Sequence, residues 1–533
     1  MQTCAVIGCG AAGMTATATL RQHGLLVTCF DLASAPGGVW QSSSHDAFSS
    51  RGLISPIYPT MRCPLPKDLM AFSDLRFDYR VAQFPHHGAV RHYLGRCAEA
   101  RGVHGLTRFN TKVESARLDA RDGLWKLLTV NVVSGDVLEF AFDRVCVCTG
   151  RTHAAAYPGD LRRRLAAYTR AGGELFHAAH LKDFRALRRK RVVVVGDGLT
   201  AYDYGLALKR FGAEVYHSTL LGPAAAEEGV WGGFWRPREP PRGGAIRDAA
   251  TLLSLALLRL PAWRGDVHKA NALLQRWMRY RNHHIEAIPR VGAVLGAEDR
   301  GLLFAPDPTA RVPQGELLDE AARHHLGRRP GTSLTEQGVF IDHIDVVVSA
   351  TGYHLRFPFL HPTLRRELEG DPSRLLPGPN PAPPDAHFDR RGLYLGTIST
   401  AHPSLAFVGT QNGLLPPFLM FEIQSRFIAH AFTRRLTLPA SPADRIADEA
   451  RLLAQNPLLA DLYNPQGLGL HSAVYFNVLQ QQMGVASKET YTSKVFDRYR
   501  WFLISSALGV YHKFRAMAPL KRKKQHLLFS NAI

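Results

Sequence analysis

The sequence lacks any apolar segment long enough to cross a membrane as a helix. A membrane-spanning helix needs about 20 mostly apolar residues, and the longest apolar candidates, residues 249–260 and 501–511, are well short of that. The first expected strand begins at residue 3, which leaves no room for a cleavable signal before it. We therefore expect neither a spanning helix nor a removable leader.

Cysteine is scarce. The chain has only 7 cysteines, an odd number, and all of them precede residue 149. They form neither a disulfide framework nor a set with the spacing of zinc ligands. Cys146 and Cys148 share one face of an expected strand, where core packing is the expected role, and His177 and His180 lack a third metal ligand. These absences favour a chain without a metal site in a reducing compartment, the cytoplasm.

Acidic residues are outnumbered by basic ones, 45 to 65, which gives a formal net charge of +20. The basic residues are spread along the chain without a basic and aromatic module, so we expect no nucleic-acid partner. Residues 249–260, and residues 501–511 with the basic run 521–524 behind them, are suited to peripheral contact with an anionic membrane surface. A buried helix in the first case and a solvated tail in the second explain the same patterns equally well.

The N-terminus, in contrast, carries a dinucleotide-binding signature. An apolar strand containing Val6 and Ile7 leads into a Gly-x-Gly-x-x-Gly loop, and a helix is expected over residues 11–22. In such a loop the glycines allow a tight turn, close approach of a pyrophosphate and close helix packing, while the helix N-terminus attracts the anion. A carboxylate about 20 residues later accepts from a ribose hydroxyl. The residues expected to bind FAD here are Gly8, Cys9, Gly10, Ala11, Ala12, Gly13 and Asp31.

A second signature of the same kind follows the basic run that ends at Arg191. Residues 192–195 are four valines that form the strand, and Ala201 takes the place of the third glycine because it is small enough for close packing. The first helical turns also carry two polar side chains. The residues expected to bind the nicotinamide dinucleotide are Gly196, Gly198, Thr200, Ala201 and Asp203.

The next strand, residues 213–218, leaves the choice of nicotinamide cofactor open. It ends in no acid that would favour NADH, and Leu220 stands near the position where an arginine would bind the 2′-phosphate of NADPH. Both NADPH and NADH therefore remain candidates.

Several further stretches follow one another along the chain. They are Gly37-Gly38-Val39-Trp40, residues 57–74, Cys148-Thr149-Gly150, Ala350-Thr351-Gly352-Tyr353, residues 402–409 and residues 422–426. In this order they resemble motifs of the flavin-containing monooxygenases, in the animal branch that oxygenates nitrogen and sulfur. The resemblance places residues 57–74 over the flavin ring. It adds to the FAD-binding set the residues Gly38, Val39, Trp40, Cys63 and Pro64.

The resemblance implies an α/β fold with two Rossmann-like dinucleotide-binding domains, the second inserted in the first. The expected FAD domain comprises residues 1–155 and 330–435, and the NAD(P)H domain comprises residues 156–329 with an insertion at about 229–289. A helical and basic C-terminal extension is expected over residues 436–533.

The chemistry implied by the resemblance is oxygen transfer. Reduced nicotinamide gives hydride to FAD, and the reduced flavin captures O₂ as a peroxide adduct. The outer oxygen of that adduct then goes to a soft nitrogen or sulfur nucleophile, a small molecule. In such enzymes the cofactor carries the reaction, while the protein positions the reactants and excludes water.

The chain departs from the family at two places. In the fingerprint F-x-G-x-x-x-H-[S/T], Gly173 and His177 match, but Ala171 replaces the aromatic residue and Ala178 replaces the hydroxyl residue. His177 is therefore either functional or a partly buried loop histidine. The asparagine that the family places over the flavin aligns with Pro64, which has neither a side-chain amide nor a backbone N–H.

Two neighbours are candidates to replace that asparagine. Cys63 is either a polar substitute or a packing residue, and Asn412 either reaches the flavin from a second loop or makes a turn. The candidate catalytic set is Cys63, Pro64 and Asn412. Because Pro64 weakens the case for oxygen transfer, two alternatives remain. One is an NAD(P)H oxidase or flavin reductase that releases peroxide, and the other is a non-catalytic FAD-binding protein that acts through partners.

Overall fold

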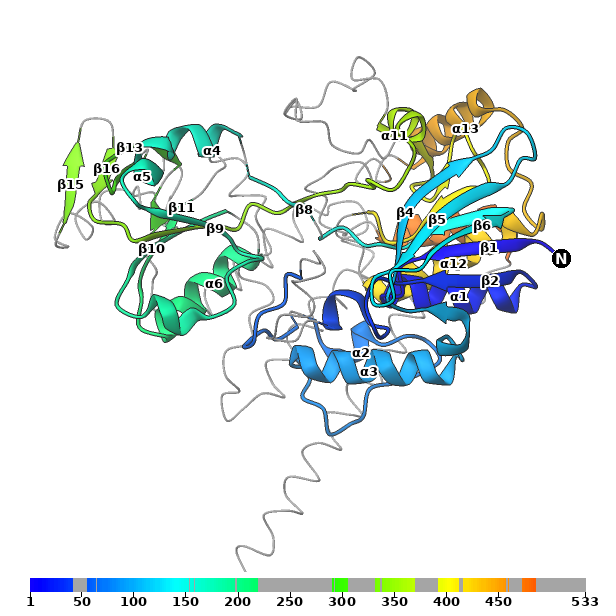
Figure 1. Cartoon of the computed structure of the whole chain (residues 1–533), viewed down its shortest axis with the longest axis horizontal. Helices are drawn as coiled ribbons and strands as arrows, with labels where there is room; N and C mark the ends of the chain where they lie inside the picture. Colours follow the sequence, from blue (N-terminus) through cyan, green and yellow to red (C-terminus); the bar gives the residue numbers. More distant parts are fainter. Residues whose placement is uncertain are drawn as a thin grey trace, which may run out of the picture. The chain divides into compact units, whose positions relative to one another are not determined.

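The computed structural model contains two compact units. Unit 1 comprises Met1–Leu53, Leu65–Arg151 and Leu355–Ile533, and unit 2 comprises Ile54–Pro64 and Thr152–His354 (Figure 1). The residues that the structure describes are 1–41, 55–63, 65–152, 154–157, 159–196, 199–218, 290–291, 293–304, 331–335, 338–369, 392–411, 416–456, 459 and 472–485. The positions discussed above that lie outside the described residues are Pro64, Gly198, Leu220, Asn412, the insertion at 229–289 and the runs 249–260, 501–511 and 521–524.

A seven-stranded sheet forms the centre of unit 1. Its strands, in spatial order, are β19 (Leu393–Tyr394), β20 (Ile398–Ser399), β21 (Leu405–Phe407), β7 (Arg144–Val147), β1 (Thr3–Ile7), β2 (Leu26–Phe30) and β3 (Thr107–Arg108). The strands from β21 to β3 run parallel, and β19 and β20 are antiparallel additions at one edge. Because β1 lies in the middle and is buried on both faces, its sequence is apolar throughout rather than alternating.

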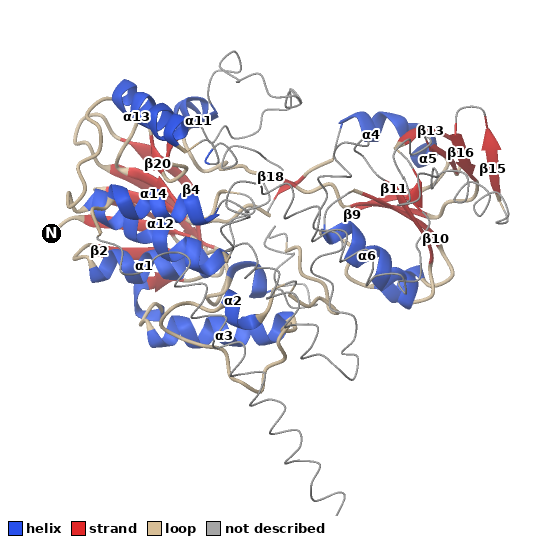
Figure 2. Ribbon diagram, turned by 180° about the vertical axis from the view of Figure 1, so that it is seen from behind, coloured by secondary structure: helices blue, strands red, loops and turns tan. Residues whose placement is uncertain are grey.

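The two faces of this sheet are covered differently. Helices α1 (Ala11–Gln22) and α12 (Pro417–Phe432) pack side by side, and Figure 2 shows them over one face. On the other face, Ala5 and Ile7 of β1 join a core with a three-stranded antiparallel sheet, which supplies the fully buried Trp125. That sheet consists of β4 (Thr111–Leu118), β5 (Trp125–Asn131) and β6 (Val137–Phe142). The first glycine loop therefore rests on a densely packed support.

Further helices complete unit 1. They are η1 (Gly38–Gln41), α2 (Lys67–Met70), α3 (His87–Ala100), η2 (His104–Leu106), α11 (Pro362–Glu369), α13 (Pro442–Gln455) and α14 (Ser472–Gln482). A capping box between Ser441 and Asp444 starts α13. On α14, the buried Tyr475 donates a hydrogen bond to the carbonyl of Leu395 at 2.9 Å, and Gln424 of α12 donates to the Tyr475 hydroxyl at 3.1 Å. The described helices of the C-terminal extension are thus part of the packing of unit 1.

Unit 2 is built around a five-stranded parallel sheet. Its strands, in spatial order, are β12 (Arg290–Val291), β11 (Glu214–Ser218), β10 (Arg191–Val195), β17 (Val346–Ser349) and β9 (Glu174–His177). The described helices of this unit are α4 (Gly159–Arg164), α5 (Ala166–Arg170), η3 (Phe184–Leu187) and α6 (Leu199–Arg210). The sheet is buried on both faces by two separate apolar clusters.

Two smaller sheets also lie in unit 2. A four-stranded antiparallel sheet holds β13 (Val294–Glu298), β14 (Gly301–Phe304), β16 (Gly338–Ile341) and β15 (Thr332–Thr335), in that order. The short strands β8 (Ala154–Ala155) and β18 (Tyr353–His354) pair with each other where the chain enters and leaves the unit. Two Rossmann-like sheets in one chain confirm the expected fold class.

The return of the chain to unit 1 lies later than the sequence predicts. The expected boundary is residue 330, whereas unit 2 extends to His354. The physical reason is β17, which lies between β10 and β9 and pairs with both through backbone hydrogen bonds, so that strand completes the second sheet. Among the described residues, no helix is long and apolar enough to cross a membrane.

Candidate active site

The first glycine loop is shaped by contacts that only glycine allows. Gly8 has φ of +98°, and a Cβ atom there would lie 2.7 Å from the carbonyl oxygen of Cys148. A Cβ atom at Gly13 would lie 1.7 Å from the carbonyl oxygen of Gly8, so α1 packs directly on the loop. These two glycines set the distance between β1, α1 and the end of β7, as the dinucleotide signature predicts.

The middle glycine of the loop faces the Gly37-Gly38 turn. Gly38 has φ of +57°, and a Cβ atom there would lie 2.9 Å from the Cα atom of Gly10. Gly37 N–H donates to the carbonyl of Cys9 at 2.9 Å, which ties η1, with Val39 and Trp40, to the loop. Within the described chain, no side chain caps α1 at Gly10, so the N–H groups of its first turn point to an anion site.

Asp31 lies directly beside this loop, as expected. Its carboxylate accepts hydrogen bonds from the backbone N–H of Cys9 and, at 2.7 Å, from that of Ala33. The side chain is buried, and the loss of solvation raises the pKa of Asp31 to about 6, against the opposing effect of the two N–H donors. Bonds to ribose hydroxyls would add donors that favour the charged form.

The residues present fit FAD on two further observations. The hydroxyl of Thr149, at the turn that contacts Gly8, is buried and has no hydrogen-bond partner among the described residues. The Gly10 and Gly38 backbones leave a cradle that side chains would fill. A dinucleotide with hydroxyl and phosphate groups is the kind of ligand that such a cradle accepts.

The segment after Pro66 is held firmly in unit 1. Glu422 of α12 accepts from the backbone N–H and the hydroxyl of Ser73, at 2.8 and 2.9 Å. Arg101 makes a two-point ion pair with Asp74, with bonds of 2.7 and 2.8 Å, and its guanidinium lies 4.1 Å from the ring centre of Phe72. This part of the family-like segment therefore belongs to the FAD unit.

The second glycine loop repeats the first in its described part. Gly196 has φ of +137°, and a Cβ atom there would lie 2.5 Å from the carbonyl oxygen of Ala350. Below the loop, the Nε2 of the buried His217 lies 2.6 Å from the carbonyl oxygen of Gly196, the distance of a hydrogen bond. The sequence patterns did not identify His217. A histidine on the strand next to a glycine turn could have indicated such a bond.

The helix after this loop carries the other expected residues. Ala201 is buried against the sheet, and Thr200 is half-buried on the first turn. Asp203 accepts a hydrogen bond from the hydroxyl of Tyr58 at 3.2 Å, a contact that sequence spacing does not reveal. Tyr353, at the paired Ala-Thr-Gly element, has a buried hydroxyl without a partner among the described residues, which leaves a donor for a ligand. This unit thus fits a second dinucleotide.

His177 has a structural role in the described chain. Its Nε2 bonds to the carbonyl of Gly352 at 2.9 Å, and its Nδ1 accepts from the backbone N–H of Ala179 at 3.1 Å. Burial lowers the pKa of His177 to about 4, so the ring is neutral at physiological pH. One ring nitrogen thus holds the Ala-Thr-Gly turn at Gly352, and the other holds the backbone at Ala179.

Of the three candidate catalytic residues, only Cys63 lies among the described residues. Cys63 is buried, and burial raises the pKa of its thiol to about 12, so it is a neutral S–H group rather than a thiolate. Cys146 and Cys148 are free and buried, with their sulfur atoms 3.7 Å apart, as core packing predicts. No group of three metal-ligating side chains occurs among the residues described.

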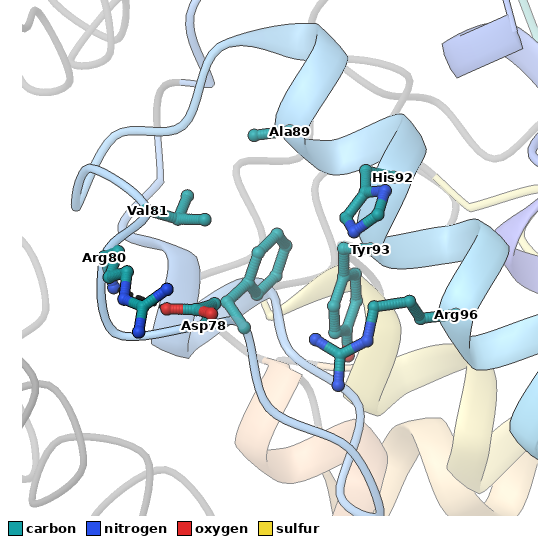
Figure 3. A pocket seen from close by; sticks show the side chains of 8 residues that line it. Asp78, Arg80, Val81, Ala89, His92, Tyr93 and Arg96 are labelled. Atoms are coloured by element: carbon teal, nitrogen blue, oxygen red, sulfur yellow. Dashed lines mark hydrogen bonds between the residues drawn. The ribbon is translucent and has the colours of Figure 1, made fainter.

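A hollow of about 280 Å³ lies elsewhere in unit 1 (Figure 3). Its lining includes the stacked pair of Phe77 and Tyr93, whose ring centres are 3.7 Å apart. Arg80, His92 and Arg96 stand around it. It contains none of the residues of either glycine loop, so it is separate from the dinucleotide sites.

Comparisons with known proteins agree with this geometry. The family model for flavin-binding monooxygenase-like proteins matches residues 1–228. Flavin-containing monooxygenase 3 of Homo sapiens is 25% identical over 444 residues, which cover 82% of this chain and 74% of that protein. The N-oxide-forming dimethylaniline monooxygenase 2 of Pan troglodytes is 24% identical over 445 residues, with coverages of 82% and 74%.

Solved structures show the same fold. The S-allyl-L-cysteine S-oxygenase from Allium sativum superposes with a TM-score of 0.60 at 20% identity, over 96% of this chain and 93% of that one. Taken with the two glycine loops, these similarities confirm the predicted resemblance. The chain is similar to flavin-binding monooxygenase-like proteins, and these similarities support an oxidoreductase that uses FAD, NADPH and O₂ on small molecules.

Proposed function

We propose that this enzyme transfers one atom of O₂ to a soft nitrogen or sulfur nucleophile. The balanced reaction consumes substrate, O₂, NADPH and a proton, and it gives the oxygenated substrate, NADP⁺ and water. The observation that carries this proposal is the cradle at Gly10 and Gly38, with Asp31 beside it, in a chain that has a second glycine loop at Gly196. Two separate dinucleotide sites suit hydride transfer from NADPH to FAD.

On the FAD side, the chain supplies a preformed anion site. The N–H groups of Ala11 and Ala12 lie at the positive end of the α1 dipole, next to a loop where Gly10 leaves room for a pyrophosphate. Asp31 orients the ribose through its carboxylate, and Trp40, on η1, flanks the same loop. Bound FAD supplies hydride uptake and the activation of O₂.

On the nicotinamide side, Gly196 shapes the turn before α6, and Ala201 keeps the helix close to β10. Thr200 offers a hydroxyl on the first turn. We assign Asp203 to this site as well, through the contact with Tyr58 that is described above. The residues of this loop bind and orient the dinucleotide, while the apolar core below them keeps the turn rigid.

The substrate class follows from the names of the relatives. One is an S-oxygenase of S-allyl-L-cysteine, a thioether, and another is an N-oxide-forming dimethylaniline monooxygenase, which acts on an amine. Both substrates present a lone pair on a polarisable or electron-rich atom. We therefore assign thioethers and tertiary amines to this chain as the first compounds to test.

A second function is favoured by one specific feature, the position of Pro64. Proline offers no amide to the flavin, and the neighbouring Cys63 is a neutral thiol, which is a weak hydrogen-bond donor. Asn412 is the remaining amide candidate. If neither side chain replaces the missing amide, the enzyme acts as an NADPH oxidase or flavin reductase and releases hydrogen peroxide.

The ratio of peroxide released to NADPH consumed separates these functions. With a thioether or tertiary amine present, oxygen transfer predicts a ratio well below one and an equivalent amount of S-oxide or N-oxide. An oxidase gives a ratio close to one and no oxygenated product. Purified protein that holds FAD but never consumes NADPH or NADH would instead indicate a non-catalytic FAD-binding protein.

We also propose that the enzyme works in the cytoplasm and contacts membranes peripherally. The free, buried cysteines suit a reducing compartment, and the net charge of +20 favours an anionic surface. Sedimentation with vesicles that contain phosphatidylserine, compared with neutral vesicles, tests the second point. Equal recovery in the supernatant with both kinds of vesicle would refute membrane contact.

A further inference from the structure

Residues 55–63, which we call the docked segment, fold onto unit 2. The flanking stretches Met1–Leu53 and Leu65–Arg151 both belong to unit 1, whereas Ile54–Pro64 belongs to unit 2. The docked segment contains Cys63 and is part of the stretch that resembles the flavin-covering segment of the family. Contacts with distant residues of unit 2 must hold it there.

The first of these contacts is made by a half-buried lysine. Lys182, in the loop before η3, donates from its Nζ to the carbonyl oxygens of Ser55 at 2.6 Å and Ile57 at 2.7 Å. Charge-assisted bonds of this kind are stronger than bonds between neutral groups. Lys182 therefore fixes the backbone at the start of the docked segment.

The second contact is an aromatic cluster around Tyr58. The Tyr58 ring centre lies 5.4 Å from that of Phe184 and 4.8 Å from that of Tyr204, both in the core of unit 2. Tyr58 is only 6% exposed, and Met61 packs against the same core. The middle of the docked segment is thus an integral part of this hydrophobic core.

The third contact connects the docked segment to the second glycine loop. The Tyr58 hydroxyl donates to the carboxylate of Asp203 at 3.2 Å, across 145 residues of sequence. Asp203 lies on α6, whose N-terminus is at the second glycine loop. A ligand that orders the start of α6 therefore acts on Asp203, and through it on Tyr58.

We propose that Asp203 and Tyr58 are positioning residues that couple dinucleotide binding at the second glycine loop to the order of the docked segment. Asp203 acts on the docked segment through Tyr58, and Lys182 anchors the start of the same segment. The coupling is reciprocal. If the bound ligand favours the ordered docked segment, the ordered segment raises the affinity for the ligand by the same factor. This inference rests on the proposed nicotinamide site, but it requires no oxygen transfer.

Two measurements on the full-length, FAD-loaded protein test the coupling. Calorimetry gives the NADP⁺ affinity of the wild type, Tyr58→Phe, Asp203→Asn and the double variant. Each single variant should weaken binding by about threefold to tenfold, the value of a lost hydrogen bond to a charged group. The double variant should bind NADP⁺ no more weakly than the single variant with the lower NADP⁺ affinity, because both changes break the same bond.

Amide hydrogen exchange gives the second readout. NADP⁺ should slow exchange in residues 55–63 of the wild type, and this slowing should shrink in both single variants. Tyr79→Phe is the matched control, because Tyr79 lies in unit 1 and its hydroxyl bonds to Arg80. It should leave both measurements unchanged, and the thermal melting of each variant shows whether it is folded.

The outcomes separate the inference from the proposed function. Binding of NADP⁺ without any slowing of exchange in residues 55–63, or additive losses in the double variant, overturns the coupling alone. Failure of the wild type to bind NADP⁺ at all overturns the nicotinamide site together with the coupling. Slowing that disappears in the variants supports the coupling even if the enzyme releases only peroxide.

Discussion

The two glycine loops of this chain have the same close approach between the first glycine and a neighbouring backbone carbonyl. At the first loop, the space that a Cβ atom of Gly8 would need is taken by the carbonyl of Cys148, at 2.7 Å. At the second loop, the corresponding space at Gly196 is taken by the carbonyl of Ala350, at 2.5 Å. In each case a Thr-Gly pair follows shortly after the neighbouring strand, so the same close approach of two backbones occurs twice.

The side chains below the two loops differ. By strand register, Cys29 in β2 occupies the place that His217 occupies in β11. The Cys29 thiol is 3.7 Å from the carbonyl oxygen of Gly8, whereas the His217 ring nitrogen is 2.6 Å from that of Gly196. Backbone geometry is therefore common to both loops, while the groups that stabilise the loop and contact the ligand are specific to each one.

The third glycine position gives the largest expected difference between the loops. Gly13→Ala should prevent folding or cost several kcal/mol, because its Cβ atom would lie 1.7 Å from the carbonyl oxygen of Gly8. Ala201→Gly makes the reverse change in the second loop and should cost only about 1 kcal/mol, the usual penalty of glycine in a helix. Urea unfolding and the FAD content of each purified variant measure both effects. Similar losses in the two variants would contradict the expected difference and show that the first loop accommodates a Cβ atom at Gly13.

Sequence reasoning succeeded where the determinants are local. The helix expected over residues 11–22 is α1, with the same bounds, because its glycines, apolar strand and terminal acid are close together in sequence. It did not find Lys182, Tyr58 or His217. The bond between Tyr58 and Asp203 joins residues 145 positions apart, and such pairs depend on tertiary packing that no local pattern encodes.

The same limit explains the domain boundary. The sequence placed the return to the FAD domain at residue 330, but β17 pairs with β10 and β9 in unit 2. Strand order in a parallel sheet is set by long crossovers, so it follows from the global fold. Pro64 and Asn412 are outside the described residues, so their roles remain predictions from the sequence.

Asp31 gives the next largest effect, because the described second loop has no equivalent carboxylate. With the pKa of Asp31 raised to about 6 by burial, the carboxylate is charged above that pH and protonated below it. FAD needs the charged acceptor, so its affinity should fall roughly tenfold between about pH 7 and about pH 5, as one pKa unit corresponds to about 1.4 kcal/mol. Fluorescence titration with FAD measures this change.

The free energy of unfolding depends on pH in the opposite sense to the FAD affinity. The folded-state pKa of Asp31, about 6, exceeds its unfolded value of 3.8, so the contribution of this group to the stability of the FAD-free chain is lost as pH rises through about 6. Asp31→Asn should flatten both pH profiles. A pH-dependent FAD affinity that persists in Asp31→Asn would assign the titration to another group.

The smallest expected effect compares the side chains beneath the loops. His217→Leu leaves the carbonyl of Gly196 without its donor. An unpaired buried acceptor costs about 1–3 kcal/mol, and only part of this cost lowers the affinity for the ligand, so NADP⁺ binding should weaken severalfold. Cys29→Ala removes a thiol contact of 3.7 Å, a weak bond, so FAD affinity should change less than twofold. His217→Gln keeps an N–H donor and serves as the matched control. If the Leu and Gln variants bind NADP⁺ equally well, the hydrogen bond has no part in shaping the second loop, and the difference between the loops lies in the ligand-contacting residues alone.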